Sequence, residues 1–134
     1  SMASKKVKES LYLPVKDYPY LKEFKELFSI NEDEVAFPYK GKIYSNKELT
    51  EDLVEHEKVH FRQQDEIGAD EWIKEYLANP SFRVKMEVEA YKHQLSLIKD
   101  RNMKEAIRIQ IAKALSSPMY GNVLTYKEAY SKIY

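Results

Sequence analysis

Cysteine is absent from this chain of 134 residues. Its absence excludes disulfides, thiolate ligands for zinc and a cysteine nucleophile. Histidine is scarce, with three copies, so a transition-metal site would need most of the histidines and would take its remaining ligands from Asp or Glu. Glycine also occurs three times, and each copy falls where a turn is expected.

Long apolar runs and an excess charge of either sign are also missing. No stretch approaches the roughly 18 apolar residues that indicate a membrane-spanning helix, so we expect no membrane partner. The polar and basic start of the chain is not followed by an apolar stretch, so we expect no secretory signal. The 22 basic and 22 acidic side chains cancel, which argues against nucleic acid as a partner.

The length is typical of one domain, which we place at residues 10–134. Residues 1–9 are interpreted as a flexible arm, in which Ser1 before Met2 is typical of a residue left by an expression vector. Apolar periodicity and turn residues predict mainly helices, with a small sheet near the N-terminus. The expected fold class is therefore α+β and mostly helical.

Two features predict the sheet. The apolar residues in 10–15 alternate with other residues, which indicates a short strand. Residues 34–44 indicate a β-hairpin that turns at Lys40 and Gly41. Pro38 cannot donate to a sheet ladder, so the first strand of this hairpin should be an edge strand.

Start and stop signals divide the rest of the chain into helices. Ser45 with Glu48 has the spacing of a capping box, and so has Thr125 with Glu128. Gly68 is a typical helix stop. The expected helices cover about residues 17–28 with Asp17 as cap, 46–67, 70–78, 82–99 with Ser81 as cap, 103–115, and a short stretch after Thr125.

One short motif contains residue types that can bind a metal ion and transfer a proton. Residues 56–60 read His-Glu-Lys-Val-His, and positions four apart lie on the same face of a helix. His56 and His60 can therefore hold one metal ion between them. Glu57 lies beside that face and can reach a water bound to the metal.

Helical phase supports this interpretation. At about 100° per residue, the two histidines share an inward face with mostly apolar residues, and charged residues face outward. The inward set is Leu49, Leu53, Gln64 and Ile67, and the outward set is Glu51, Glu55, Lys58, Arg62 and Glu66. Burying two unpaired imidazoles is costly, so a shared metal ion is favoured over two unrelated core histidines.

A third ligand is expected in the 82–99 helix. Helical phase puts Glu87 at the centre of the apolar face and Glu89 on the solvated face, while His93, the other option, lies at the boundary. A carboxylate in an apolar face needs a cation, which is either the metal or a base such as Arg83 one turn earlier. The upstream histidine pair favours the metal.

These residues resemble a known family, the gluzincin metallopeptidases, and most of all the small single-domain versions encoded by bacteria and their phages. The matching pattern is His56-Glu57-x-x-His60 followed by Glu87-x-Glu89-Ala90-Tyr91. The pair Gln63-Gln64 matches a glutamine that often follows the second histidine. The charged residues Glu55 and Lys58 depart from the family pattern, but both face outward. The resemblance covers about residues 49–95 and implies a zincin-like active-site helix.

The resemblance implies one Zn²⁺ per chain, with His56, His60 and Glu87 as its ligands. It also implies that Glu57 is the general base. Tyr91 stands where larger gluzincins often carry an Asp that orients a ligand histidine, so its hydroxyl is expected to take that role.

The implied activity is zinc-dependent hydrolysis of a peptide bond in a protein or peptide substrate. By analogy, such a substrate can pair as an extra strand along the 35–44 hairpin. The developing oxyanion needs a stabiliser besides zinc, and the candidates are Tyr91, Arg83, His93 and Tyr120. The implied location is the cytoplasm of a bacterial host or a phage particle.

Two alternatives stay open. A catalytically silent zincin-like protein, for example a component of a phage particle, would use the metal for structure and bind a partner, with the stripe of Tyr126, Tyr130 and Tyr134 as a docking surface. A purely structural helical domain would bind no metal. A degenerate enzyme would usually have lost Glu57 first, so its presence favours catalysis.

Overall fold

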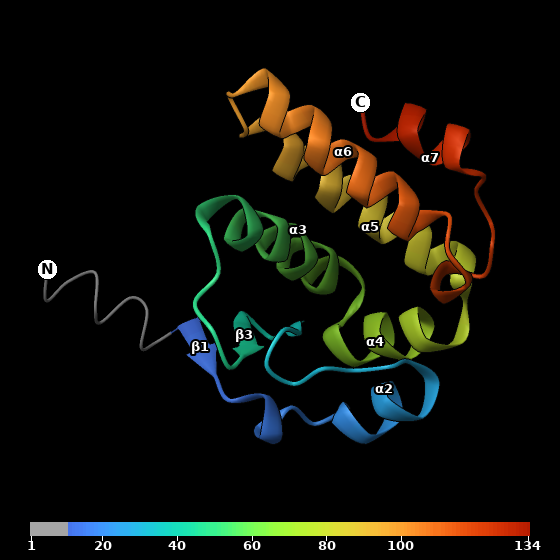
Figure 1. Ribbon diagram of the computed structural model, residues 1–134. Coiled ribbons are helices and arrows are strands. Elements are labelled where there is room, and N and C mark those ends of the chain that lie inside the picture. The colour runs from blue at the N-terminus through green and yellow to red at the C-terminus, as the bar shows by residue number, and fades with distance from the viewer. Residues whose placement is uncertain (1–10) are drawn as a thin grey trace, which may run out of the picture.

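The computed structural model describes residues 11–134 (Figure 1), so the predicted arm at 1–9 lies outside the described residues. The described part contains six α-helices, two short 3₁₀ helices and a three-stranded sheet, which confirms a mostly helical α+β fold. None of these helices combines the length and apolar character needed to cross a membrane. The elements are β1 (Tyr12–Leu13), η1 (Val15–Asp17), α2 (Leu21–Leu27), β2 (Ala36–Tyr39), β3 (Lys42–Ser45), α3 (Glu51–Ile67), α4 (Ala69–Ala78), α5 (Pro80–Ser96), α6 (Arg101–Leu115), η2 (Pro118–Tyr120) and α7 (Tyr126–Lys132).

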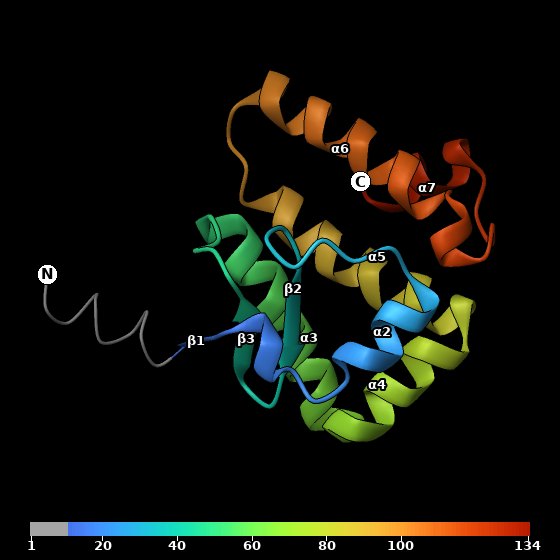
Figure 2. The same cartoon turned by 60° about the horizontal axis from the view of Figure 1, so that its bottom comes forward.

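The sheet has the strand order β1-β3-β2 (Figure 2). Strands β2 and β3 form the predicted antiparallel hairpin, and its turn residues Lys40 and Gly41 have φ of 50° and 77°, as a two-residue type I′ turn requires. Pro38 lies on the edge strand β2, as predicted. Strand β1 pairs in parallel with β3 and is shorter than predicted, because Val15 already begins η1.

The predicted start of α3 is wrong. Ser45 lies in β3, where it pairs with Ala36 of the hairpin. Its Oγ exchanges hydrogen bonds with the backbone of Lys47, so Ser45 does not form a capping box with Glu48. The extended backbone that strand pairing requires excludes a helix at this point, and α3 begins at Glu51.

Two further predicted caps are also wrong. Asp17 ends η1 and caps no helix, since α2 begins only at Leu21. At α5 the cap is Asn79, whose side chain accepts hydrogen bonds from two backbone N–H groups of the first turn. Pro80 is the first helical residue, a position that proline fits because its missing N–H is not needed there, so the helix starts before Ser81.

The C-terminal helices follow the prediction more closely. Thr125 and Glu128 form the predicted capping box at the start of α7. Helix α5 ends earlier than expected, at Ser96, and α6 begins earlier, because Asp100 caps it through the N–H of Met103.

The tyrosine stripe of the C-terminal segment is only partly free. Tyr130 donates a hydrogen bond to Glu105, and the guanidinium of Arg108 lies 3.7 Å from its ring centroid, so Tyr130 packs on α6. Tyr126 stacks on Tyr130, while Tyr134 is 89% exposed.

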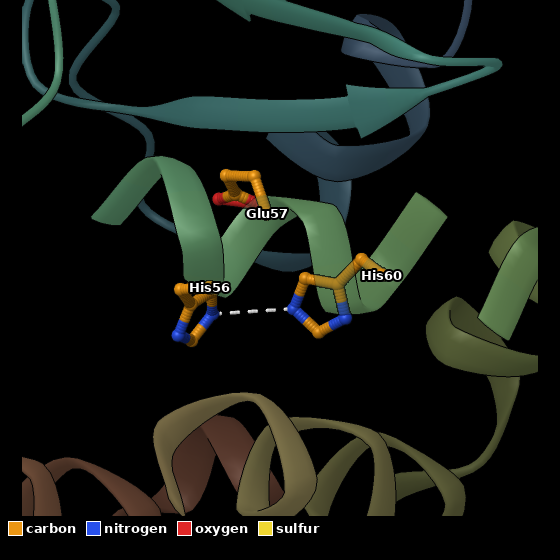
Figure 3. A group of neighbouring side chains, drawn as sticks. All are labelled: His56, Glu57 and His60. Carbon is orange, nitrogen blue, oxygen red and sulfur yellow. Dashed lines mark hydrogen bonds between the residues drawn. The ribbon is translucent and has the colours of Figure 1, made fainter. Parts of the chain in front are cut away.

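Helix α3 lies between the hairpin and α5 (Figures 2 and 3), and an apolar cluster lies on each side. The aromatic cluster comes from the N-terminal half and α4, and consists of Val15, Tyr18, Phe24, Phe37, Trp72, Ile73 and Tyr76. The aliphatic cluster comes from α5 onward and consists of Val84, Leu95, Ile111, Ala112, Leu115, Tyr120, Leu124, Ala129 and Ile133. Neither cluster includes a residue of α3 itself.

Candidate metal centre

The buried side chains of α3 are all polar: His56, Glu57, His60, Gln63 and Gln64. An amphipathic helix normally buries apolar side chains, because a buried polar group without a partner is costly. Of the apolar residues predicted on the inward face, Ile67 is 48% exposed, so that part of the prediction is wrong. The buried polar face of α3 therefore needs partners from other elements.

Two histidines and one glutamate meet at this face. The Nε2 atoms of His56 and His60 are 3.2 Å apart, and their rings point toward each other and toward α5 (Figure 3). Oε1 of Glu87 on α5 lies 3.0 Å from the first Nε2 and 2.9 Å from the second. The structure thus brings together the three predicted metal ligands.

The spacing of these three atoms suits a zinc ion. Ligand atoms at about 2.0–2.2 Å from a tetrahedral zinc are about 3.3–3.6 Å apart. The observed separations of 2.9, 3.0 and 3.2 Å are slightly shorter, so a small outward shift would suffice. A ligand set of two imidazoles and one carboxylate is also the set found in catalytic zinc sites that keep a fourth position open.

The other ring nitrogens are bonded to glutamines. Nδ1 of His56 lies 3.0 Å from Oε1 of Gln94, and Nδ1 of His60 lies 2.8 Å from Oε1 of Gln63. An amide oxygen only accepts, so each Nδ1 carries a proton and donates it. In neutral rings, each Nε2 would then present a lone pair to the centre, so the short contact between the two Nε2 atoms requires either a proton on one of them or a metal ion between them.

Further contacts fix the orientation of both glutamines. The amide nitrogen of Gln94 donates to Asp52 at 2.8 Å, and that of Gln63 donates to Glu89 at 2.8 Å. Trp72 donates to the amide oxygen of Gln63 at 3.2 Å. Reversing either amide would break these bonds, so the amide oxygens are held toward the histidines.

Sequence reasoning missed these positioning roles. It assigned the orientation of a ligand histidine to Tyr91, whereas Nδ1 of His56 is bonded to Gln94. Tyr91 instead places its ring 4.5 Å from the ring of His56, edge to face. A signal existed for Gln63, since it follows His60 by one helical turn, but Gln94 lies on another helix.

The Glu87 carboxylate is anchored from both sides. Its second oxygen, Oε2, accepts a hydrogen bond of 2.6 Å from the hydroxyl of Tyr76. Burial by itself raises the pKa of Glu87, but the imidazoles of His60 and His56 outweigh burial and hold that pKa well below its ordinary value. In return, burial lowers the pKa of His60, and the Glu87 carboxylate more than reverses this and raises it to about 9. A proton and a metal ion therefore compete for the same atoms.

Glu57 has a different environment from Glu87. It is 8% exposed, and its Oε2 has no hydrogen-bond partner among the described residues. Ligand atoms of Glu57, His56 and His60 lie within 4.8 Å of one another. Glu57 projects toward the hairpin side of α3, whereas the histidines project toward α5 (Figure 3). Burial raises the pKa of Glu57, and the imidazoles oppose this.

The predicted burial of Glu87 and the predicted exposure of Glu89 are both confirmed. Glu89 is exposed and pairs with Arg62 across to α3, whereas Glu87 is buried. The alternative partner for Glu87, Arg83, forms no ion pair with it among the described residues; its guanidinium lies over the ring of Phe28 instead.

A cavity of about 240 Å³ opens at the metal centre, lined by both histidines, Glu57, Glu87 and several aromatic rings. Of the four candidates for the oxyanion stabiliser, Tyr91 and Tyr120 line this cavity. His93 is 43% exposed at its side chain and lies 3.5 Å from Glu55, away from the centre. Burial raises the pKa of Tyr91 well above its ordinary value, so its hydroxyl stays protonated and able to donate.

The hairpin edge is partly closed. The side chain of Gln64 donates to the carbonyl of Pro38 at 2.8 Å and accepts from the N–H of Lys40 at 3.1 Å. These groups belong to the edge strand β2 and its turn, so they cannot pair with a substrate strand while Gln64 holds them. The predicted strand addition along 35–44 is thereby restricted to the end near Ala36.

No family model, curated protein or solved structure matches this chain. The resemblance to the gluzincins therefore rests on the motif residues alone, and any activity inferred from it is a proposal.

Proposed function

We propose that this protein binds one Zn²⁺ through His56, His60 and Glu87 and hydrolyses peptide bonds with Glu57 as the general base. One observation carries the proposal. Two buried imidazoles, each donating its Nδ1 proton to a glutamine, direct their Nε2 atoms at each other and at one buried carboxylate oxygen. This arrangement is costly unless a proton or a metal ion lies between these atoms, and it matches the ligand set of a zinc site with an open position.

Zinc at this position would polarise a substrate carbonyl and lower the pKa of a bound water toward neutrality. Glu57, buried and unpartnered at Oε2, is suited to take a proton from that water and deliver it to the leaving amine. Tyr91 and Tyr120 line the same cavity, and a tyrosine hydroxyl there can donate to the oxyanion. Asp52 and Tyr76 act indirectly, by holding Gln94 and Glu87 in place.

Two measurements test the proposal. Elemental analysis of protein purified without added metal should find about one zinc per chain. Glu87→Gln should lose this zinc, whereas the matched control Glu89→Gln should keep it. Zinc retained in Glu87→Gln would mean that the third ligand is wrong.

Activity is then compared between the wild type and Glu57→Gln on a peptide library. A general base contributes about 10²–10⁴-fold, so the variant should lose at least a hundredfold in rate while keeping its zinc. Equal cleavage by both proteins would show that Glu57 is not the general base. Bound zinc without cleavage by either protein would favour the catalytically silent binding protein instead.

A further inference from the structure

Arg83 is a buried cation without an anion among the described residues. Arg83 is 5% exposed, and its Nε has no hydrogen-bond partner in the described part of the chain. The guanidinium carbon lies 4.9 Å from the ring centroid of Phe28 and 5.8 Å from that of Tyr76. Cation–π contacts of this kind fix the side chain, but they offset only part of the cost of removing a guanidinium from water.

Arg83 is one of the residues that line a surface groove. The groove runs from the end of α2 to η2 and is lined by apolar residues, including Leu27, Ile30 and Met119. Leu27 is 58% exposed and Met119 is 40% exposed. Among the described residues, no acidic side chain lines the groove, so Arg83 gives it a positive charge in a mainly apolar surrounding.

This groove adjoins the cavity at the metal centre. Ile30 and Met119 line both spaces. Arg83 also precedes Glu87 by one turn on α5, which puts their Cβ atoms about 5–6 Å apart. A ligand in the cavity can therefore reach Arg83 with a group that lies about one residue away from the metal centre, at about 3.3–3.6 Å per residue.

We propose that Arg83 binds a carboxylate of the peptide that occupies the metal-centre cavity. A guanidinium offers paired donors that match the two oxygens of a carboxylate, and the unpartnered Nε is one of these donors. The carboxylate belongs either to the C-terminus of the peptide or to an acidic side chain beside the scissile bond. That the peptide is a substrate rests on the proposed function, but carboxylate binding by Arg83 requires no hydrolysis.

The test uses the full chain carrying Glu57→Gln, so that no probe is cleaved. N-acetyl-leucine is titrated against N-acetyl-leucinamide, which differs only in the carboxylate. Acetyl-Leu-Asp-amide and acetyl-Leu-Asn-amide form a second pair, in which the carboxylate is on a side chain. Calorimetry gives the affinity, and the ¹⁵N–¹H resonance of the Arg83 Nε reports directly on the guanidinium.

One acid of the two pairs should bind at least about tenfold more tightly than its amide partner and should shift the Arg83 Nε resonance. The pair that discriminates identifies the source of the carboxylate. Arg83→Gln should abolish the discrimination and Arg83→Lys should retain part of it. Arg108→Gln, which removes a cation over Tyr130 at a residue that does not line the cavity, should leave the discrimination unchanged.

Equal binding of acid and amide in both pairs would overturn the inference without the use of any Arg83 variant. Discrimination that persists in Arg83→Gln would place the carboxylate on the metal and would also overturn it. Zinc content is measured on the same preparations. Zinc-free protein that still discriminates through Arg83 would contradict the proposed function alone, and zinc-loaded protein that binds acid and amide equally would contradict this inference alone.

Discussion

Helix α5 packs against α3 and against the C-terminal helices through two different surfaces. Toward α3 it presents Glu87 and Gln94, which are hydrogen bonded to the histidines of α3. Toward α6 and α7 it presents Val84 and Leu95, which belong to the aliphatic cluster. One contact is therefore polar and the other apolar, although the same helix supplies both.

The apolar and the polar contact of α5 contribute differently to stability and to binding. The apolar contact stabilises the fold by about 25 cal/mol for each Å² of apolar surface removed from water. A buried set of charged and polar groups gains little net stability, because desolvation offsets the attraction between them. The polar contact between α3 and α5 is thus hard to explain by stability alone, and it fits a surface that is organised to bind an ion.

The largest expected effect on stability lies in the apolar contact. Leu115 is fully buried in the aliphatic cluster, so Leu115→Ala should lower the free energy of unfolding by about 2–5 kcal/mol through lost contacts and a cavity. Urea denaturation measures this change, and zinc bound per folded chain should stay the same. A large loss of zinc by the folded variant would show that the two contacts are not independent.

A smaller effect on stability is expected in the loop around Gly121, which lies between the aliphatic cluster and the cavity. Tyr120 belongs to the aliphatic cluster and also lines the cavity, and Gly121 follows it with φ of 69°. A Cβ on Gly121 would lie 2.5 Å from the Cβ of Pro80, so Gly121→Ala should cost about 1–3 kcal/mol. Gly41→Ala is the matched control, since Gly41 also has positive φ but no described residue other than its chain neighbours lies within 4 Å of a Cβ there. Equal melting of the two variants would rule out the close approach as the cause.

A change in the polar contact between α3 and α5 should lower zinc affinity, unlike a change in the apolar contact. Replacing Gln94 by Leu removes the acceptor for Nδ1 of His56, so zinc affinity should fall about 10–100-fold. The unfolding free energy of the metal-free protein should fall by about 1–3 kcal/mol, less than in Leu115→Ala, because the buried Nδ1–H of His56 is left without an acceptor. Competition with a chromogenic chelator measures the affinity, with Gln110→Leu on the exposed side of α6 as the control. Unchanged zinc affinity in Gln94→Leu would show that Gln94 does not support zinc binding.

The smallest effect is expected away from both contacts. Asp70 accepts hydrogen bonds from Tyr20 at 2.6 Å and Tyr39 at 2.7 Å, and these bonds lower its pKa. Because its pKa is lower in the folded state, Asp70 contributes stability above its unfolded pKa of about 3.9, and this is lost as pH falls through the folded value.

Asp70→Asn should therefore be less stable than the wild type at pH 7, and the difference should shrink in acid. Chemical denaturation with a chelator present keeps the metal centre out of the comparison. Asp65→Asn, at an exposed position of α3, is the control. A difference between wild type and Asp70→Asn that stays constant from pH 7 to strong acid would contradict the pKa assignment.

Local patterns predicted most of the elements and the positions of the proposed ligands. The hairpin turn at Lys40-Gly41 and the Thr125–Glu128 capping box depend on residues close in sequence, and both are confirmed. Ser45 also had the spacing of a cap, but strand pairing with Ala36 decided its conformation. Helical phase gives the direction of a side chain, but it does not show whether another element lies on that side. Phase therefore predicted that Ile67 points inward, whereas Ile67 is 48% exposed at the end of α3.

The sequence by itself determined that His56 and His60 share a face of one helix, and that Glu87 lies on the inward face of another. Helical periodicity is enough for that, because it depends only on the spacing along the chain. Tertiary structure alone decided that these faces meet, that Gln94, held by Asp52, receives the Nδ1 proton of His56, and that Tyr76 holds the carboxylate. Those partners come from different helices, and their directions are set by how the helices pack.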